Sequence, residues 1–311
     1  MDRPLAVGVD GSEASLRAVD WAADEAALRG VPLHVVHASL WELYERAVFP
    51  SGREPPTEKL LTDVLAVAAA KRARARIPGL EVTTEVVPEG PVSVLRRAAR
   101  KAAALVLGSH GRGSAAELLL GSVGLAVAGR ADGPVIVVRG DPDAPDDPHD
   151  PSASRPGRDP TGVRPRGGPV VVGVPAGMAE SAAVRFAFRE AARRGVPVEA
   201  VRVWHRPAHE TTGHPWFTGA QARMNRKRAA EVLETGLRAP ARELPDVEVR
   251  RRIVEGQART VLPGTSAGAA LLVVGARRPH GRFGLHIGRV THAVLHHAPC
   301  PVAVVPEEEA P

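Results

Sequence analysis

The sequence repeats itself over almost its whole length, and this repeat limits the possible folds more than any other feature. Residues 190–197 (EAARRGVP) match residues 25–32 (EAALRGVP) at an offset of 165 positions, and residues 288–305 match residues 121–138 at an offset of 167. A nearly constant offset over such a length indicates that a whole domain was duplicated. We therefore expect one domain over residues 1–140 and a second over residues 169–306.

The segment between the two halves has a different composition. Residues 141–168 are dense in Pro, Asp, Gly and Arg and contain almost no apolar side chain. Such a composition predicts a disordered, extended linker. The last residues, 307–311, include three consecutive glutamates and are expected to form a short acidic tail.

Within the first half, short apolar runs alternate with stretches of helical periodicity. The pattern predicts strands over residues 5–9, 31–38, 81–87, 103–107 and 134–138, with helices after Ser12, over 57–77 and 91–102, and after Gly121. Gly30 is expected to end the first helix in a left-handed conformation. Because the strands are apolar on both faces, they belong to a parallel sheet covered on both sides. The predicted fold is α/β, with two tandem Rossmann-like domains that each contain a five-stranded parallel sheet.

One glycine-rich stretch, residues 106–123 (VLGSHGRGSAAELLLGSV), stands between the fourth strand and the helix that follows it. Gly108, Gly111 and Gly121 have the spacing G-x2-G-x9-G, and Ser122 comes directly after the last glycine. Glycines let a backbone approach a ligand closely, and a helix start offers unpaired N–H donors to an anion. Ser122 is a natural N-cap whose hydroxyl could also bind a phosphate oxygen. On spacing alone, a triphosphate cradle and a plain glycine turn are about equally good interpretations.

The stretch differs from two common phosphate-binding motifs. It has no lysine, so it is not a P-loop, and its glycines follow the fourth strand rather than the first, so it is not a dinucleotide fingerprint.

The net charge of +6 and the pI of about 10.3 do not by themselves indicate a nucleic-acid-binding protein. The arginines are spread over both halves, and the densest cluster, KRARAR at residues 71–76, lacks aromatic partners for bases.

The single cysteine, Cys300, excludes an intrachain disulfide. With no long apolar run and no signal-peptide pattern, the chain is expected to be soluble and cytoplasmic, with no membrane partner.

Taken together, these residues resemble the universal stress protein family. The resemblance rests on residues 8–12 (GVDGS), the G-x2-G-x9-G-Ser spacing and the closing strand at 134–138 (PVIVV), and it extends over both halves. It implies an adenine nucleotide alpha hydrolase-like fold that binds ATP together with Mg²⁺ beyond the ends of the strands. Carried over to this sequence, the ATP-binding residues would be Gly8, Asp10, Ala38, Gly108, His110, Gly111, Arg112, Gly113, Ser114, Gly121, Ser122, Val123 and Gly124.

The resemblance also implies a role for each group of residues. The glycines and Ser122 would hold the phosphates, Asp10 would face the ribose or its metal, and the backbone at Ala38 and near Gly8 would border adenine. A plain helix cap stays open as an alternative for Asp10. His110 and Arg112 could add charge to the loop or point to solvent.

The second half departs from this pattern in three places. Pro175 stands where the first half has Asp10, Arg278 replaces the second glycine, and Arg289 replaces the serine. We predict that the second domain binds ATP weakly or not at all, although arginines favour phosphate and a different anion or nucleotide pose stays open. The degenerate second site would comprise Gly173, Gly275, Arg278, Gly288 and Arg289.

Two further groups of residues need an interpretation. A metal cluster is one interpretation of His292, His296, His297 and Cys300. The favoured interpretation is that the histidines belong to a polar helix end and that Cys300 is a small apolar residue. In the family the fifth strand pairs across a dyad. The resemblance therefore makes Val135–Val138 and the stretch 302–305 (Val302 to Val305) candidates for self-association, within the chain or in a homodimer.

Three functions are compatible with the sequence. The preferred one is an ATP-dependent regulator of an unidentified protein in the stress response. The others are a slow ATPase and a nucleotide-free tandem scaffold that acts through protein contacts. No catalytic residue is expected, because no general base lies near the glycine-rich stretch. At most, the chain would hydrolyse ATP slowly.

Overall fold

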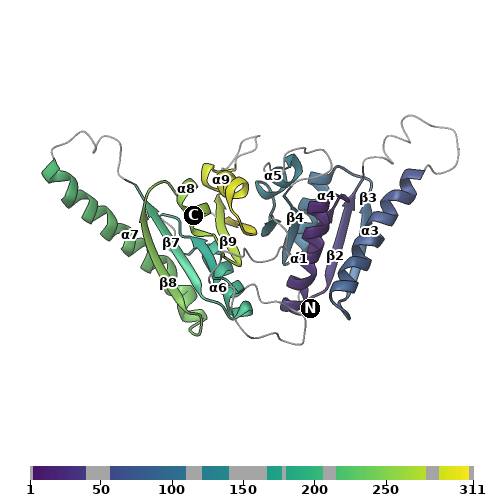
Figure 1. The fold of residues 1–311 in the computed structure, drawn as a ribbon, viewed down its shortest axis with the longest axis horizontal. Coiled ribbons are helices and arrows are strands. Elements are labelled where there is room, and N and C mark those ends of the chain that lie inside the picture. Colours follow the sequence, from purple (N-terminus) through teal and green to yellow (C-terminus); the bar gives the residue numbers. More distant parts are fainter. Residues whose placement is uncertain are drawn as a thin grey trace, which may run out of the picture. The chain divides into compact units, whose positions relative to one another are not determined.

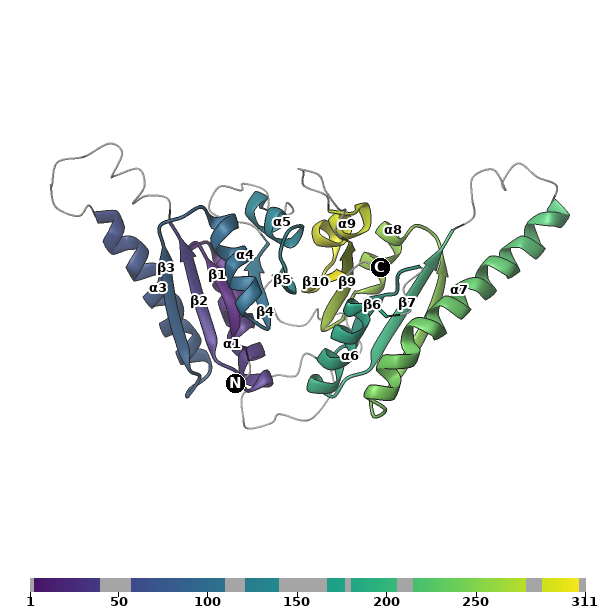
Figure 2. The same ribbon diagram turned by 180° about the vertical axis from the view of Figure 1, so that it is seen from behind.

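A computed structural model describes residues 3–39, 57–109, 121–139, 167–176, 180–205, 215–277 and 287–307. The chain divides into two compact units: Met1–Val127 and Ala131–Pro165 belong to the first, and Ala128–Arg130 and Arg166–Pro311 belong to the second. Figures 1 and 2 show the helices and strands of each unit from two opposite sides.

The first unit alternates strands and helices along the chain. Its elements are β1 (Leu5–Val9), α1 (Glu13–Arg29), β2 (Leu33–Ala38), α3 (Thr57–Arg76), β3 (Val82–Val87), α4 (Pro91–Lys101), β4 (Ala104–Gly108), α5 (Ser122–Ala128) and β5 (Val135–Val138). The strands are parallel and lie in the order β3-β2-β1-β4-β5. This confirms the predicted five-stranded parallel sheet.

Helices cover both faces of this sheet. A Cβ built at Gly8 would point at Leu95 of α4, whereas one built at Gly108 would point at the backbone of α1. Because these glycines face opposite sides of neighbouring strands, α1 and α4 lie on opposite faces of the sheet. The strand residues between them are aliphatic, and every residue of β1 and β5 is buried.

The second unit repeats the same plan. Its elements are β6 (Val170–Gly173), α6 (Ala182–Arg194), β7 (Val198–Trp204), α7 (Pro215–Glu243), β8 (Val249–Glu255), α8 (Ala258–Thr265), β9 (Leu271–Arg277), α9 (Arg289–His297) and β10 (Val302–Glu307). Its parallel strands have the equivalent order, β8-β7-β6-β9-β10. Figure 1 shows α7 running along β7 and β8 within this unit.

The first helix of each unit begins and ends in the same way. The Ser12 hydroxyl accepts a hydrogen bond from the Ser15 amide at 3.2 Å, and the Ser181 hydroxyl accepts one from the Val184 amide at 3.3 Å. Gly30 and Gly195 then end α1 and α6 with φ of 64° and 63°. The predicted left-handed end of the first helix is thus confirmed, and the second unit has the same end.

Candidate functional site

The carboxyl ends of the strands in the first unit bring together several of the predicted ATP-binding residues. In the register of the sheet, Gly8 pairs with Val36 of β2, and Val7 pairs with Val106 of β4. Gly8, Ala38 and Gly108 therefore lie at one edge of the sheet, where ligands of parallel α/β folds bind. Five further predicted residues lie outside the residues that the structure describes: His110, Gly111, Arg112, Gly113 and Ser114.

The start of α5 is tied to the end of β4. The Gly121 amide donates a hydrogen bond to the Ser109 carbonyl at 2.8 Å, and the Leu125 amide donates the first intrahelical bond to the Gly121 carbonyl at 3.0 Å. Gly121 is therefore the N-cap, and the expectation that Ser122 holds that position is wrong by one residue. Ser122, Val123 and Gly124 form the first turn, whose amides have no acceptor within the helix.

Gly108 has a packing role that its sequence context did not reveal. A Cβ at this position would lie 2.5 Å from the Ala14 carbonyl oxygen and 2.8 Å from the Ser15 nitrogen. Both atoms belong to the backbone of α1, so they cannot move aside as a flexible side chain would. Gly108 thus allows α1 to pack directly on β4, in addition to any role in binding a ligand.

Asp10 is bonded to Ser12, the N-cap residue of α1. Its Oδ1 accepts hydrogen bonds from the Ser12 amide at 3.0 Å and from the Ser12 hydroxyl at 2.6 Å. This is an Asx-turn that leads the chain from β1 into the helix. The N-cap of α1 is Ser12, whose hydroxyl accepts a hydrogen bond from the Ser15 amide, so Asp10 supports the cap residue and does not cap the helix itself. The half-buried Asp10 carboxylate lies at the carboxyl edge of the sheet, and its ligand role stays a prediction.

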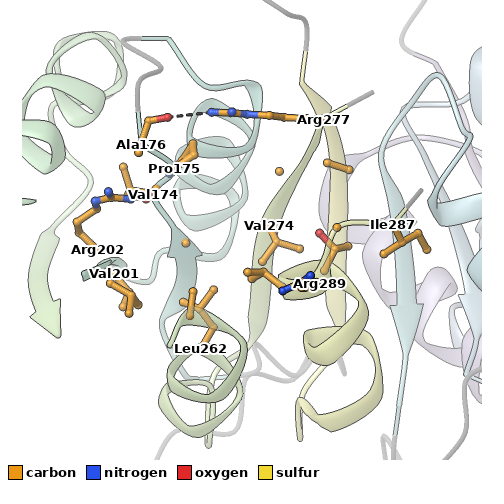
Figure 3. Close-up of a pocket in the computed structure, with 18 residues that line it drawn as sticks. Val174, Pro175, Ala176, Val201, Arg202, Leu262, Val274, Arg277, Ile287 and Arg289 are labelled. Atoms are coloured by element: carbon orange, nitrogen blue, oxygen red, sulfur yellow. Dashed lines mark hydrogen bonds between the residues drawn. The ribbon is translucent and has the colours of Figure 1, made fainter. Parts of the chain in front are cut away.

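The second unit has a cavity at the same edge of its sheet. The cavity has a volume of about 830 Å³ and lies among the ends of β6, β7 and β9, helix α8 and the start of α9 (Figure 3). Four of the five residues predicted for the second site line it: Gly173, Gly275, Gly288 and Arg289. The fifth, Arg278, lies outside the described part of the chain.

Arg202 is a residue of this cavity that the sequence analysis missed. Its Nη1 donates a hydrogen bond to the Val174 carbonyl at 3.0 Å, and its Nε is buried with no partner among the described residues. Burial lowers the pKa of the guanidinium below its ordinary value, because desolvation disfavours the charged form. The first unit has His37 at the corresponding register position, with Nδ1 2.7 Å from the Val9 carbonyl. The duplication offset of 165 could have identified this pair from the sequence.

Glu307 is a second residue that the sequence analysis placed differently. It is the last residue of β10 rather than part of a tail, and its side chain is buried. The carboxylate accepts hydrogen bonds from the Ala182 amide at 2.8 Å, the Ala183 amide at 3.2 Å and the Ser181 hydroxyl. A Cβ at Gly275 would lie 2.5 Å from the Glu307 Oε1. In this unit a carboxylate from the far end of the domain therefore fills the space over the glycine.

The histidines of α9 and Cys300 show no metal-binding arrangement in the described ranges. The rings of His292 and His296 have centroids 4.4 Å apart, and no three His, Cys, Asp or Glu residues there are grouped to hold a metal ion. Cys300 is buried, and burial raises the pKa of its thiol to about 11.

No helix among the described residues has both the length and the apolarity needed to span a bilayer.

Comparison with known proteins agrees with this fold. The family model described as "Universal stress protein family" matches residues 1–139 and 168–306. Universal stress protein Rv2005c of Mycobacterium tuberculosis is 34% identical over 307 residues, covering 96% of each chain, and a universal stress protein of Mycolicibacterium smegmatis is 31% identical over 308 residues, covering 97% of this chain and 96% of the relative. The crystal structure of a universal stress protein from Archaeoglobus fulgidus covers 97% of this chain and 98% of its own, with a TM-score of 0.58 at 17% identity. The chain belongs to the universal stress protein family and contains two copies of its domain.

Proposed function

We propose that the first unit binds ATP, with Mg²⁺ beside the phosphates, and that the chain acts as a nucleotide-dependent regulator in the stress response rather than as an enzyme. The observation that carries this proposal is the hydrogen bond from Gly121 to Ser109. It holds the first turn of α5 against the end of β4, so the last glycine and Ser122 lie next to the strand from which the glycine-rich stretch starts.

The difference between the two halves supports the same assignment. The first half has the complete G-x2-G-x9-G-Ser spacing and Asp10, whereas the second half has Arg278, Arg289 and Pro175 at the matching positions. In the ATP-binding branch that the first half resembles, the glycines and Ser122 would hold the phosphates. Asp10, already fixed by its bonds to Ser12, would face the ribose or the metal.

Ser122 offers a cleaner test of this site than Gly108 does. A side chain at position 108 would collide with α1, so a variant of Gly108 could lose ATP binding because it misfolds. Ser122 is exposed, and Ser122→Arg introduces the residue that the second half has at this place, Arg289. Ala68→Arg, at an exposed position in the middle of α3, adds the same charge to the same unit and serves as the control.

The experiment measures the nucleotide released from denatured protein and the affinity of the purified chain for Mg-ATP. We expect ATP in the wild type and in Ala68→Arg, and an affinity at least about tenfold lower in Ser122→Arg, because a bulky side chain would block the first turn of α5. A wild type that contains no nucleotide and does not bind added Mg-ATP would contradict the proposal and favour the scaffold function. A release dominated by ADP would favour the slow ATPase.

We further propose that the strands β5 and β10 mediate self-association. Each is the last strand of its unit, and an apolar edge strand needs a cover. Sedimentation of the chain with and without Mg-ATP tests whether the nucleotide changes this association; a monomer under both conditions would exclude pairing between chains.

A further inference from the structure

We propose that the cavity of the second unit is a separate binding site for an organic anion with an apolar body, and that Arg202 neutralises the anionic group of this ligand. The proposal goes beyond ATP binding by the first unit and does not depend on it.

The charged side chains around the cavity all carry the same sign. Arg202, Arg277 and Arg289 belong to its lining, and none of the described lining residues is an Asp or Glu. Figure 3 shows Arg202 beside Val174 and Pro175 on one side of the cavity, with Arg289 on the α9 side. Glu307 is not one of the lining residues, although its carboxylate lies over Gly275, where it keeps its charge and accepts hydrogen bonds from the start of α6. An anionic ligand would therefore meet three cationic side chains and no acid among the described lining residues.

Arg202 is the lining cation that is partly buried, and one of its nitrogens is buried without an acceptor among the described residues. Burial of a guanidinium without a counter-charge is unfavourable, and a carboxylate or phosphate provides paired acceptors that match its planar donors. Only the bond to the Val174 carbonyl engages this side chain among the described residues, and its Nε is buried without an acceptor. Arg277, in contrast, is exposed and donates to the Ala176 carbonyl at 2.8 Å.

The rest of the wall is apolar. Val174, Val201, Leu262 and Val274 supply aliphatic side chains, and a volume of about 830 Å³ lies within the range of small-molecule sites. Pro175 replaces the acid of the first half, so this wall lacks the carboxylate that would face a sugar hydroxyl. The chemistry of the cavity thus fits an apolar body with an acidic group better than a sugar-containing ligand.

The two units provide a natural comparison at this position. His37 and Arg202 both contact the carbonyl at the end of the first strand of their unit, so a histidine can reach this carbonyl from the equivalent position. A guanidinium is charged at pH 8, whereas an ordinary imidazole, with a pKa of about 6.5, is mostly neutral. Arg202→His should therefore keep a polar contact to Val174 while removing the charge, and Arg202→Met removes both. Arg250→Met, on the exposed surface of β8, changes the net charge equally and is the control.

The test uses the full-length chain at pH 8 and two fluorescent probes. Anilinonaphthalene sulfonate has an apolar body with one sulfonate, and phenylnaphthylamine has the same body without the charge. We expect the sulfonate to bind the wild type and Arg250→Met alike, and about tenfold or more weakly to both Arg202 variants, because a hydrogen bond to a charged group is lost. Binding of the neutral probe should be the same in all four proteins, which also verifies that the cavity is intact.

Two results would overturn the proposal. One is equal affinity for the sulfonate in the wild type and both Arg202 variants. The other is displacement of the sulfonate by Mg-ATP in the Ser122→Arg protein, which would make the cavity a nucleotide site. If Ser122→Arg does not affect ATP binding while the Arg202 variants lose the sulfonate, the assignment of ATP to the first unit fails and the second site stands.

Discussion

At the scale of single residues, Gly108 illustrates a glycine that packing requires whether or not a ligand does. Gly108→Ala would place a Cβ 2.5 Å from the Ala14 carbonyl oxygen, so α1 or β4 would have to shift. We expect the free energy of unfolding to fall by about 1–3 kcal/mol, the usual cost of overpacking. Denaturant unfolding of the variant measures this loss.

The matched control is Gly90→Ala in the same unit. No heavy atom lies within 4 Å of a Cβ at this position, and its φ of −58° suits any residue. The change should alter stability by less than about 1 kcal/mol. Equal stability of Gly108→Ala and the wild type would show that α1 can move aside, and the glycine would then need a functional explanation.

Residue by residue, the sequence predicted the location of those candidate residues that local signals mark. The position of Gly108, Gly121 and Asp10 at the carboxyl ends of the strands could be predicted because strand and glycine signals are local in the chain, whereas their role in binding ATP stays a prediction. The duplication offset aligns Arg202 with His37. The sequence does not show that Arg202 bonds the end of a strand 28 residues earlier or that its Nε is buried, because both depend on the fold. Ser122 was placed one position off because helix ends vary by a residue around any cap signal.

At the scale of elements, the start of α6 depends on a residue from the other end of its domain. The Glu307 carboxylate accepts hydrogen bonds from two backbone amides and the Ser181 hydroxyl, so it satisfies donors that a helix start leaves unpaired. In Glu307→Gln the charge is lost and an NH₂ group can turn toward these donors. We expect about 1–3 kcal/mol of stability to be lost, measured by thermal unfolding.

Glu248→Gln makes the same chemical change in an exposed ion pair with Arg250. Surface pairs contribute about 1 kcal/mol or less, so this variant should unfold almost like the wild type. If the two variants were equally stable, Glu307 would be only a tail residue that rests against α6.

The elements themselves were predicted well, and the reason is their regular pattern. Aliphatic runs and glycine caps located each strand and helix of the first half to within about two residues, and the duplication transferred the plan to the second. The link between Glu307 and α6 joins residues 125 positions apart in sequence, and no local signal reports such a contact.

At the scale of the whole molecule, the duplication preserved a buried ion pair in each unit. Glu25 bonds Arg29 at 2.7 Å, and Glu190 bonds Arg194 at 2.6 Å, with all four side chains at most 5% exposed. Glu190 also bonds the more exposed Arg193 at 2.7 Å. Removing one partner of a buried pair leaves a charge without its counter-ion, at a cost of about 3–5 kcal/mol. Glu25→Gln and Glu190→Gln should therefore each destabilise their own unit strongly. Glu234→Gln, in an exposed pair with Arg251, should have little effect.

These two variants can locate the bound nucleotide without any change at the site. In calorimetry of the full chain we expect two transitions, one lowered by Glu25→Gln and the other by Glu190→Gln, which assigns each transition to a unit. A ligand that binds only the native state stabilises it by about 2.7 kcal/mol at a concentration of 100 times its Kd. If ATP binds the first unit alone, Mg-ATP should raise only the transition that Glu25→Gln lowers. An equal rise of both transitions would mean that the second unit binds ATP as well, in spite of Pro175 and Arg289.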